Sequence, residues 1–565
     1  MTAAHQLSAQ SDTGFDISSS PVESEQEFHQ MLLALAPWVS RPATYPLPAH
    51  PTQKSASSSG CDFAGSNDGV SYSDVRVKLA ANRDADAWPW SAGDPIAIGG
   101  SPVTIQDRPA PAFPEEERRD NRLDLLDQAF YAGHRAAGQK EVMQVGWVYE
   151  RDLDFDALKR FHANLGRGLL GRLIERSPLP FGRYRWVADP NSSEIDLAGS
   201  PRPRAELGDW FDERTQLPID PESGPGWRLS VLPMTDGSTA LSLVLSHYVI
   251  DGIGGAVAVS EAALGMTRDL GYPPPHSRTR LQALVSDAVA TARDAPASAR
   301  AFVAAVKEAR RRQRDVARLE QARPVTLPNR YTGEPVILPS VWIQVDLNEW
   351  NARAQALGGT GNTLAAALTA KLDQRMGRTH GDADEVRMLL TVNNRTMDDV
   401  RAVAVSFARI GIDPAGVTTD LRGARASIKL GLKAFQEAPD ESAHLVAMTP
   451  FTPQRGWRHL VEYALSDPER PAVCSTLGDT GPAAIRPDGT LCDSAFARGA
   501  SQHLTRQWLE RMGSQLHVYY GTAVEINKAG IYVSAYQAGS VDTKPALREL
   551  IVRTLAEFGL AAEIV

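Results

Sequence analysis

The chain has 565 residues, and at about 100–200 residues per domain this length allows two to four domains. The net charge of −9 argues against a nucleic-acid partner, because phosphate binding depends on Lys and Arg. Three scattered cysteines, Cys61, Cys474 and Cys492, fit neither a disulfide framework nor a CxxC metal site, which favours a reducing cytoplasm.

No stretch reaches the roughly 18 apolar residues of a membrane-spanning helix, and the N-terminus lacks the pattern of a signal peptide. We therefore expect no integral membrane segment, while peripheral contact with a membrane stays open. Residues 1–118 are rich in Ser, Pro and Asp and are predicted to be an N-terminal extension and linker, with one helix over Ser24–Leu35. The extension is either an accessory segment or a lid or docking piece.

Residues 119–325 are predicted to form a first α/β half. The expected elements are a strand over Glu141–Glu150, a helix over Asp156–Arg176, a strand over Gly182–Ala188, a hairpin of Trp227–Met234 with Thr239–Tyr248, and a helix over Arg280–Arg323. The second part of the last helix is basic. This part is either a solvated connection or a surface that attracts an anionic donor, such as a CoA phosphate or an acidic carrier protein.

Residues 326–565 are predicted to form a second half. Its expected strands are Val341–Asp346, Val386–Asn393, Val403–Asp413, Leu516–Ile526 and Gly530–Gln537, and its expected helices are Asn348–Leu357, Asn362–Met376, Leu421–Ala438, Gln454–Leu465 and Lys544–Phe558. In both halves a strand leads directly into a helix, at Val148–Leu153 and again at Trp342–Leu347. The repeated order indicates a pseudo-duplicated architecture of the mixed α/β class.

The most informative segment is Leu241–Glu261, LSLVLSHYVIDGIGGAVAVSE. Alternation along a strand places His247 in phase with three leucines before it, at the end of an apolar strand and beside a glycine-rich turn. A neutral imidazole in such a place suits a general base near pH 7. A packed histidine is the structural alternative. A metal site is the other alternative, with His247 and Asp251 as ligands, but it lacks a third ligand.

This segment resembles the HHxxxDG motif of the superfamily that contains chloramphenicol acetyltransferase, condensation domains and the wax ester synthase/diacylglycerol acyltransferase group. The resemblance implies that His247 is the base, that Ser246 replaces the first histidine, and that Gly252 is the glycine of the motif. It gives Asp251 a structural part, with Arg395 as the expected partner. It also implies two similar chloramphenicol-acetyltransferase-like halves with a channel between them.

Further stretches between about 120 and 540 are similar to the same superfamily. They are Leu123–Phe130 (LDLLDQAF), Asp154–Leu158 (DFDAL), Gly182–Val187, Gly361–Leu368 (GNTLAAAL), Val392–Thr396 (VNNRT) with Val405–Phe407, and Cys474–Gly478 (CSTLG). In the last stretch, the resemblance makes Ser475 or Thr476 a candidate oxyanion donor, and a plain core strand is the alternative.

The resemblance implies an acyltransferase that moves an acyl group from acyl-CoA to a small-molecule alcohol or amine. One alternative is a condensation-type enzyme that joins substrates bound to an acyl or peptidyl carrier protein by an amide or ester bond. The other is a non-catalytic relative that binds acyl groups or a partner. Ser246 keeps this third hypothesis open. The thioester is a co-substrate, and neither a cofactor nor a metal is expected.

Overall fold

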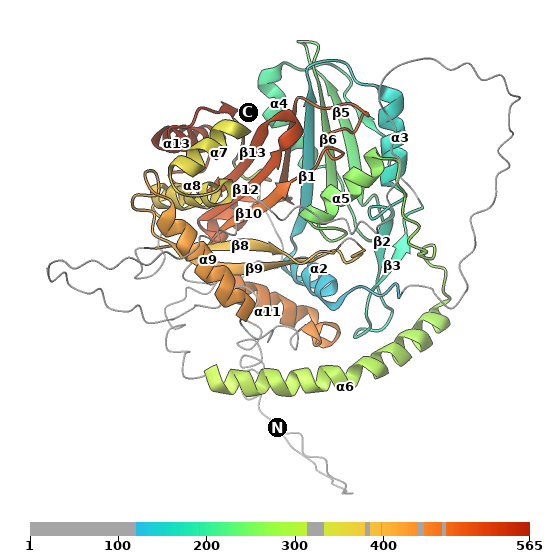
Figure 1. The fold of residues 1–565 in the computed structure, drawn as a ribbon. Helices are drawn as coiled ribbons and strands as arrows, with labels where there is room; N and C mark the ends of the chain where they lie inside the picture. Colours follow the sequence, from blue (N-terminus) through green and yellow to red (C-terminus); the bar gives the residue numbers. More distant parts are fainter. Residues whose placement is uncertain are drawn as a thin grey trace, which may run out of the picture. The chain divides into compact units, whose positions relative to one another are not determined.

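The computed structural model describes residues 120–190, 193–312, 333–378, 385–396, 398–437, 446–465 and 471–565 (Figure 1). The predicted extension over residues 1–118, with its helix at Ser24–Leu35, lies outside the described residues. So does the predicted end of the long basic helix beyond Arg312, and the helix itself is α6 (Arg280–Arg312).

The first large sheet has five strands in the order β11-β1-β6-β5-β4. Its strands are β1 (Lys140–Tyr149), β4 (Asp196–Leu197), β5 (Trp227–Pro233), β6 (Thr239–Ser246) and β11 (Ser494–Gln502). Every residue of β6 is buried, because both faces of this central strand are covered. The predicted hairpin is present, since β5 and β6 pair in antiparallel register with Val231 opposite Leu241.

Helices and a small hairpin complete this part of the chain. They are α2 (Leu125–Ala137), α3 (Phe155–Leu165), α4 (Leu207–Thr215), α5 (Gly252–Ala263), the 3-10 helix η4 (Arg204–Glu206), and the paired strands β2 (Arg172–Glu175) and β3 (Arg185–Ala188). Apolar side chains of α3 and α5 share one core with Leu241, Leu243 and Leu245 of β6. The three leucines therefore face α3 and α5. Their alternation along β6 is the pattern that was used to predict the position of His247.

One predicted helix is too long. Residues Asp156–Arg176 were expected to form a single helix, but α3 ends at Leu165, and Leu173 lies in strand β2. Gly166, Gly168 and Gly171 occupy the break, where glycine disfavours helix and permits the close turn. The leucine spacing continued through a loop into a strand, so the apolar periodicity overstated the helix.

The second large sheet has seven strands in the order β14-β7-β13-β12-β10-β8-β9. Its strands are β7 (Ser340–Asp346), β8 (Val386–Asn393), β9 (Val405–Ile412), β10 (Ala472–Asp479), β12 (Gln515–Ala523), β13 (Lys528–Tyr536) and β14 (Glu563–Ile564). The accompanying helices are α7 (Leu347–Ala356), α8 (Gly361–Met376), α9 (Arg422–Glu437), α11 (Gln454–Leu465), α12 (Arg506–Met512), α13 (Lys544–Glu557) and the 3-10 turns η6 (Thr449–Phe451) and η7 (Val524–Ile526).

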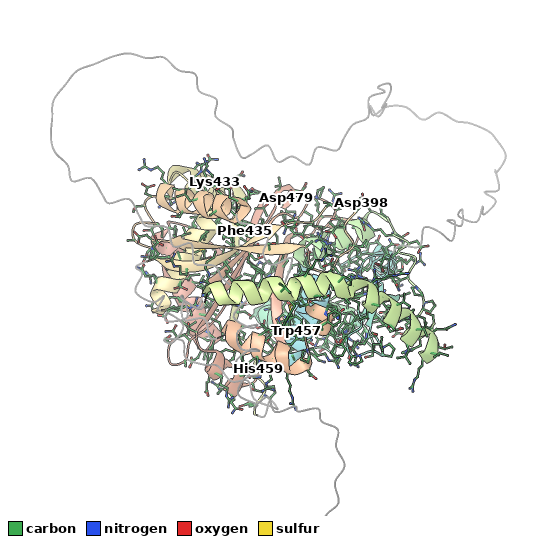
Figure 2. The ribbon with its side chains drawn as sticks, turned by 90° about the horizontal axis from the view of Figure 1, so that it is seen from below. Asp398, Lys433, Phe435, Trp457, His459 and Asp479 are labelled. Carbon is green, nitrogen blue, oxygen red and sulfur yellow. The ribbon has the colours of Figure 1, made fainter. Side chains whose placement is uncertain are left out.

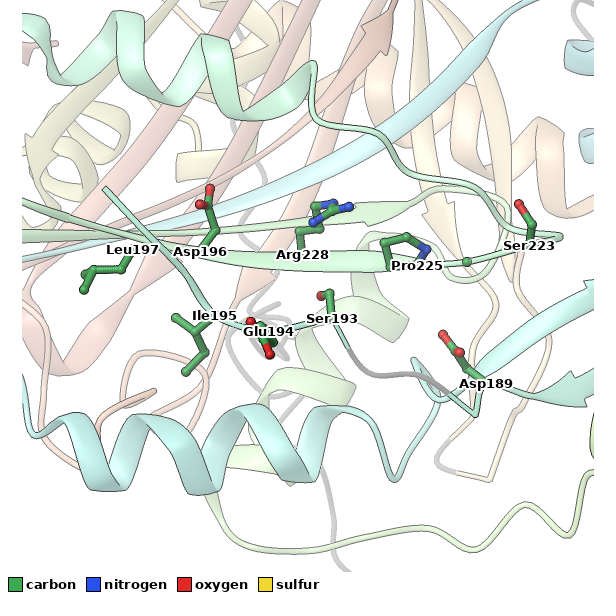
Figure 3. A pocket seen from close by; sticks show the side chains of 10 residues that line it. Asp189, Ser193, Glu194, Ile195, Asp196, Leu197, Ser223, Pro225 and Arg228 are labelled. Carbon is green, nitrogen blue, oxygen red and sulfur yellow. The ribbon is translucent and has the colours of Figure 1, made fainter. Parts of the chain in front are cut away.

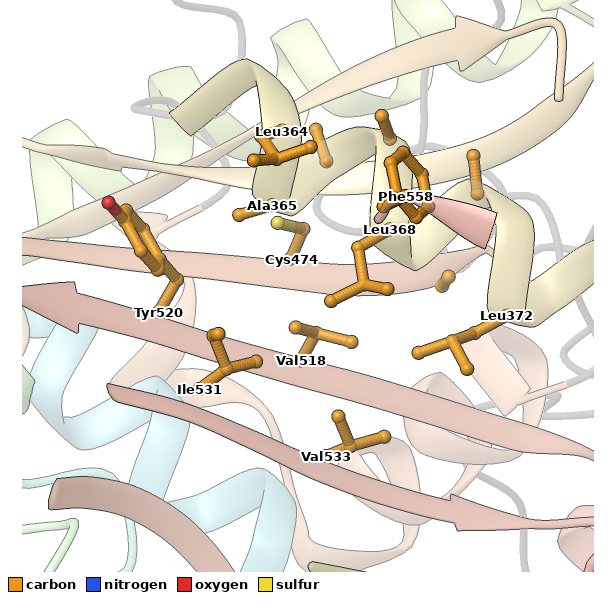
Figure 4. Close-up of a cluster of buried hydrophobic side chains, with 14 of the residues drawn as sticks. Leu364, Ala365, Leu368, Leu372, Cys474, Val518, Tyr520, Ile531, Val533 and Phe558 are labelled. Carbon is orange, nitrogen blue, oxygen red and sulfur yellow. The ribbon is translucent and has the colours of Figure 1, made fainter. Parts of the chain in front are cut away.

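The core of this part lies between the second sheet and α7, α8 and α13 (Figure 4). Leu368 and Leu372 of α8 face Val518 and Ile531 of the sheet, and Phe558 closes the cluster. Two mixed strand-and-helix assemblies, each built on its own sheet, confirm the predicted α/β class. Asp154 caps α3 and Asp346 caps α7, so the strand-then-helix repeat has the same capping chemistry in both places.

Strand β11 crosses between the two assemblies. It belongs by sequence to the second half, yet it pairs with β1 over nine residues at the edge of the first sheet. Its Arg498 is buried and binds Gln144 Oε1 at 2.7 Å and Asp212 Oδ1 at 2.8 Å from the first half, and Ser340 Oγ at 3.0 Å from the second. The sheets therefore do not separate at the predicted boundary of 325/326.

Candidate active site

His247 directly follows β6, and its backbone continues the ladder to β1. Its N–H donates to the Glu141 carbonyl oxygen at 3.1 Å, one step beyond the Ser246–Val142 pair. This bond places His247 opposite Glu141 at the end of the β1–β6 ladder.

The ring of Phe130, from α2, packs between the imidazoles of His247 and His134. The Phe130 ring centre is 5.2 Å from that of His247, and the His134 ring centre is 4.5 Å from that of Phe130. Burial lowers the pKa of His247, opposed by hydrogen bonding to its own backbone and by the Asp251 charge. Burial also lowers the pKa of His134 to about 4. Both imidazoles are consequently neutral near pH 7, which is the form that a general base requires.

Ser246, which replaces the first histidine of the motif, shapes the turn after β6. It is buried, and its Oγ accepts a hydrogen bond from the Tyr248 N–H at 3.3 Å, while its carbonyl accepts one from Val249. Tyr248 Oη in turn accepts from the Glu141 N–H at 2.9 Å. The serine thus stabilises the turn that orients the neighbouring His247. The hydrogen bonds of Ser246 go to backbone groups of the turn and not to the imidazole.

Asp251 and Arg395 form the ion pair that the resemblance implied. Arg395 Nη2 lies 2.8 Å from Asp251 Oδ2 and Nε 3.2 Å from Oδ1, with side-chain exposures of 3% and 5% for the Arg and the Asp. The carboxylate also accepts from the Gly254 and Ala404 N–H groups at 2.8 and 2.7 Å. Asp251 is therefore the N-cap of α5 and is fully bonded, so it is an anchor and not a reacting group.

Arg395 belongs to the 394–404 loop, the connection from β8 to β9, whose residue 397 is not described. Besides Asp251, Arg395 donates to the carbonyl oxygens of Asp399, Arg401 and Ala402 at 3.1–3.3 Å. The guanidinium therefore binds three carbonyl groups of its own loop and, through Asp251, holds the loop against the start of α5.

Two residues that the sequence analysis did not single out hold the same loop. Asp127 of α2 accepts from the N–H groups of Ala402 and Val403 at 2.9 and 2.8 Å. Buried Arg172 donates to the Val400 carbonyl at 2.5 Å and stacks over Trp186. The available signal was Asp127 itself, an acidic residue on the buried face of a helix within the quoted LDLLDQAF stretch.

Gly252 and Gly254 permit close packing and do not form the turn that was predicted. Neither has a positive φ, and the helix α5 already begins at Gly252. A Cβ on Gly252 would lie 2.9 Å from Leu477 Cδ2, and one on Gly254 would lie 2.9 Å from Arg395 Cζ. The glycines let β10 and the Arg395 guanidinium approach the start of α5.

The two candidate oxyanion donors lie on opposite faces of β10. Thr476 is in phase with Cys474, a member of the second core, and its N–H donates to Thr391 Oγ1 at 3.2 Å. Ser475 alternates with Thr476, and its Oγ accepts a hydrogen bond from Thr391 Oγ1 at 3.5 Å. Strand phase therefore turns the Ser475 side chain away from the second core, whereas the next residue, Leu477, lies at a register shift of β10 and contacts the start of α5 at Gly252.

A separate cavity of about 540 Å³ lies at the β4 edge of the first sheet (Figure 3). Its lining includes Asp189, Glu194, Asp196 and Arg228. None of the predicted site residues lines this cavity.

In the part of the chain that the structure describes, no group of three or more His, Cys, Asp or Glu side chains is placed to hold a metal ion. Cys474 and Cys492 are buried free thiols. None of the described helices is both long and apolar enough to cross a membrane.

Two curated proteins of Mycobacterium tuberculosis, from strains CDC 1551/Oshkosh and H37Rv and provisionally named diacylglycerol O-acyltransferases, are each 28% identical over 173 residues. The match covers 29% of this chain and 34% of each relative, so the chain spans about a third of their length. This likeness confirms the predicted resemblance to the acyltransferase group. No family model matches.

Similar solved structures share little sequence with this chain. The first condensation domain of the CDA synthetase is 12% identical, with 79% of this chain and 99% of that chain covered and a TM-score of 0.48. The TRI3 trichothecene 15-O-acetyltransferase of Fusarium sporotrichioides has 12% identity, coverages of 78% and 94%, and a TM-score of 0.48. Polyketide synthase associated protein 5 of Mycobacterium tuberculosis is 14% identical, with 77% of this chain and 98% of that chain covered and a TM-score of 0.43.

Proposed function

We propose that the protein is an acyltransferase that moves an acyl group from a thioester to an alcohol or amine, with His247 as general base. The observation that carries the proposal is a neutral, half-buried imidazole at a strand end, beside a loop held by the buried Asp251–Arg395 pair. Because His247 is only partly buried, its imidazole keeps accessible surface for an acceptor.

The proposed reaction uses one nitrogen of the imidazole. Nδ1 is buried, so Nε2 is the nitrogen assigned to the acceptor. The acceptor transfers its proton to Nε2 as its lone pair attacks the thioester carbonyl carbon. The tetrahedral oxyanion then collapses, the C–S bond breaks, and the leaving thiolate takes the proton back from His247.

Ser475 is the proposed oxyanion donor, because strand phase turns its side chain away from the second core, while Thr476 shares the phase of the core residue Cys474. A single such donor contributes about 3–4 kcal/mol of transition-state stabilisation in other enzymes. A Ser475→Ala variant should therefore keep its fold and lose a large part of kcat.

The test is a donor and acceptor screen with the full chain, read by mass spectrometry. Acyl-CoA and carrier-protein thioesters form separate donor arms, which distinguish the CoA-dependent enzyme from a condensation-type enzyme. His247→Ala should lower kcat by about 10²–10⁴-fold without changing the thermal melt. His162→Ala is the matched control, since His162 is another partly buried histidine and packs on Trp227 with ring centres 5.0 Å apart.

Two outcomes would contradict the proposal. One is transfer by the wild-type chain that is equally fast in His247→Ala, which would place the base elsewhere. The other is the absence of transfer from every donor class together with tight acyl binding, which would make the protein a binding relative.

A further inference from the structure

Helix α6 turns its apolar side away from the protein. The exposed large apolar side chains of its described part are Leu281, Leu284, Val285, Val289, Phe302 and Val303, with exposures from 39% to 71%. The exposed residues between them include Ala288, Ala292, Ala295 and Ala299. At about 100° per residue these positions fall within an arc of roughly 140°, so they form one continuous stripe. From residue 281 to 303 the stripe is about 33 Å long.

The opposite, mostly polar side of α6 contacts the protein. Asp287 accepts from Ser177 Oγ at 2.6 Å and pairs with Arg278, and Asp294 lies 3.6 Å from Arg122. Ser298 Oγ donates to the Ala447 carbonyl at 2.8 Å, and Ala301 is buried. This arrangement inverts the usual surface helix, whose apolar side faces the core. In Figure 2, which looks from below, α6 crosses the view in front of the ribbon.

Charge along the stripe has one sign. Among the described side chains of α6, the exposed charged residues are Arg280, Arg293 and Arg300, and helical phase places the first at one edge of the stripe and the others at the second edge. The two acidic residues, Asp287 and Asp294, are on the side that contacts the protein. An apolar stripe between basic edges matches the acyl boundary and headgroups of an anionic lipid surface.

We infer that α6 docks the protein on an anionic membrane surface, with the stripe in the headgroup and acyl boundary and the arginines against lipid phosphates. An acidic carrier protein could bind the arginines, but it would not cover the apolar stripe between them, which would stay exposed to water. The inference stands independently of the proposed acyl transfer.

The test is flotation of the full chain with vesicles of phosphatidylcholine, alone or mixed with phosphatidylglycerol. The wild-type chain should bind the mixed vesicles more tightly than the neutral ones. A variant with Leu281→Glu, Val285→Glu and Val303→Glu should bind them at least tenfold more weakly. The matched control carries Leu430→Glu, Val524→Glu and Val552→Glu at equally exposed apolar positions elsewhere, and should bind as the wild type does.

Three outcomes would overturn the inference. They are wild-type protein that does not bind mixed vesicles, an α6 variant that binds them normally, and a control variant that loses binding equally. Sedimentation velocity of the lipid-free chain tests the competing occupant, because a dimer that dissociates in the α6 variant would assign the stripe to a second copy of the chain.

Discussion

Glu141 lies opposite His247 at the end of the β1–β6 ladder, and Ser501 Oγ donates to its carboxylate, at 2.8 Å from both oxygens. Burial raises its pKa to about 7, with the Ser501 hydrogen bond acting in the opposite direction. A carboxyl group whose pKa is higher in the folded than in the unfolded state binds more protons when folded. Between the two pKa values, a rise in pH therefore destabilises the fold.

Replacing Glu141 by Gln should remove this pH dependence. The two proteins should have equal stability near pH 4, and the variant should become the more stable one as pH rises from about 4.5 to about 7, with a constant difference above pH 7 of up to a few kcal/mol, since each pKa unit is worth about 1.4 kcal/mol. The measurement is the difference in melting temperature from pH 4 to 8, with Glu549→Gln on the surface of α13 as the control. A difference that does not vary with pH would show that Glu141 is ionised in the folded protein.

Gly252 offers a second test at the scale of one residue. An added Cβ would lie 2.9 Å from the flexible end of Leu477, which can move aside, so Gly252→Ala should displace Leu477 and cost about 1 kcal/mol, the lower end of the range for overpacked sites. Adding Leu477→Ala should restore part of this loss by opening the space. Chemical denaturation of the two single variants and of the double variant measures these changes in the free energy of unfolding. Additive losses in the double variant would exclude this contact as the reason for the glycine.

At the scale of elements, the 394–404 loop depends on one guanidinium. Arg395→Lys keeps the charge but replaces the planar fork of donors that binds Asp251 and three carbonyl groups. We expect it to destabilise the protein nearly as much as Asp251→Ala, for which a broken buried pair suggests about 3–5 kcal/mol. Both should also lower acyl transfer, because the pair fixes the start of α5 next to His247. Arg422→Lys, in the exposed pair with Asp420, is the control. If Arg395→Lys changed neither stability nor acyl transfer, the positive charge alone would be sufficient to hold the loop.

Local patterns predicted most of these elements and only part of the site. The bounds of β8 and α11 were predicted to the residue, and the β5–β6 hairpin nearly so, because alternation, helical spacing and turn residues are local properties. The motif and its resemblance brought together His247, Asp251 and Arg395. Strand β11 was missed, because Ser494–Gln502 contains four Ala or Gly residues and few strong strand formers, and its partner β1 lies more than 340 residues away. Asp127, Arg172 and Glu141 were missed for the same reason, since their roles come from contacts between distant segments.

At the scale of the whole chain, the two sheet assemblies are joined by networks of buried charge. At β11, Arg498 binds residues of both assemblies. At the 394–404 loop, three successive N–H groups, those of Ala402, Val403 and Ala404, are all accepted by carboxylates of the first half. Asp127 takes two of them and Asp251 takes the third. Such polar contacts are directional, so they fix how the loop lies on the first half more narrowly than apolar packing alone would.

This shared loop predicts that Asp127 and Asp251 are energetically coupled. Asp127→Asn keeps the shape but offers one acceptor oxygen to two buried N–H groups, and an unsatisfied buried donor costs about 1–3 kcal/mol. Asp251→Asn should weaken the same loop from the other side. Once one carboxylate is lost the loop can loosen, so the second substitution should cost less than it does alone. We expect a coupling energy of about 0.5–3 kcal/mol from the double-mutant cycle, measured by urea denaturation. The parallel cycle of Asp127→Asn with Asp420→Asn, an exposed residue outside this network, should be additive. Additivity in both cycles would mean that the two carboxylates hold the loop independently, and the two halves would then not be coupled through it.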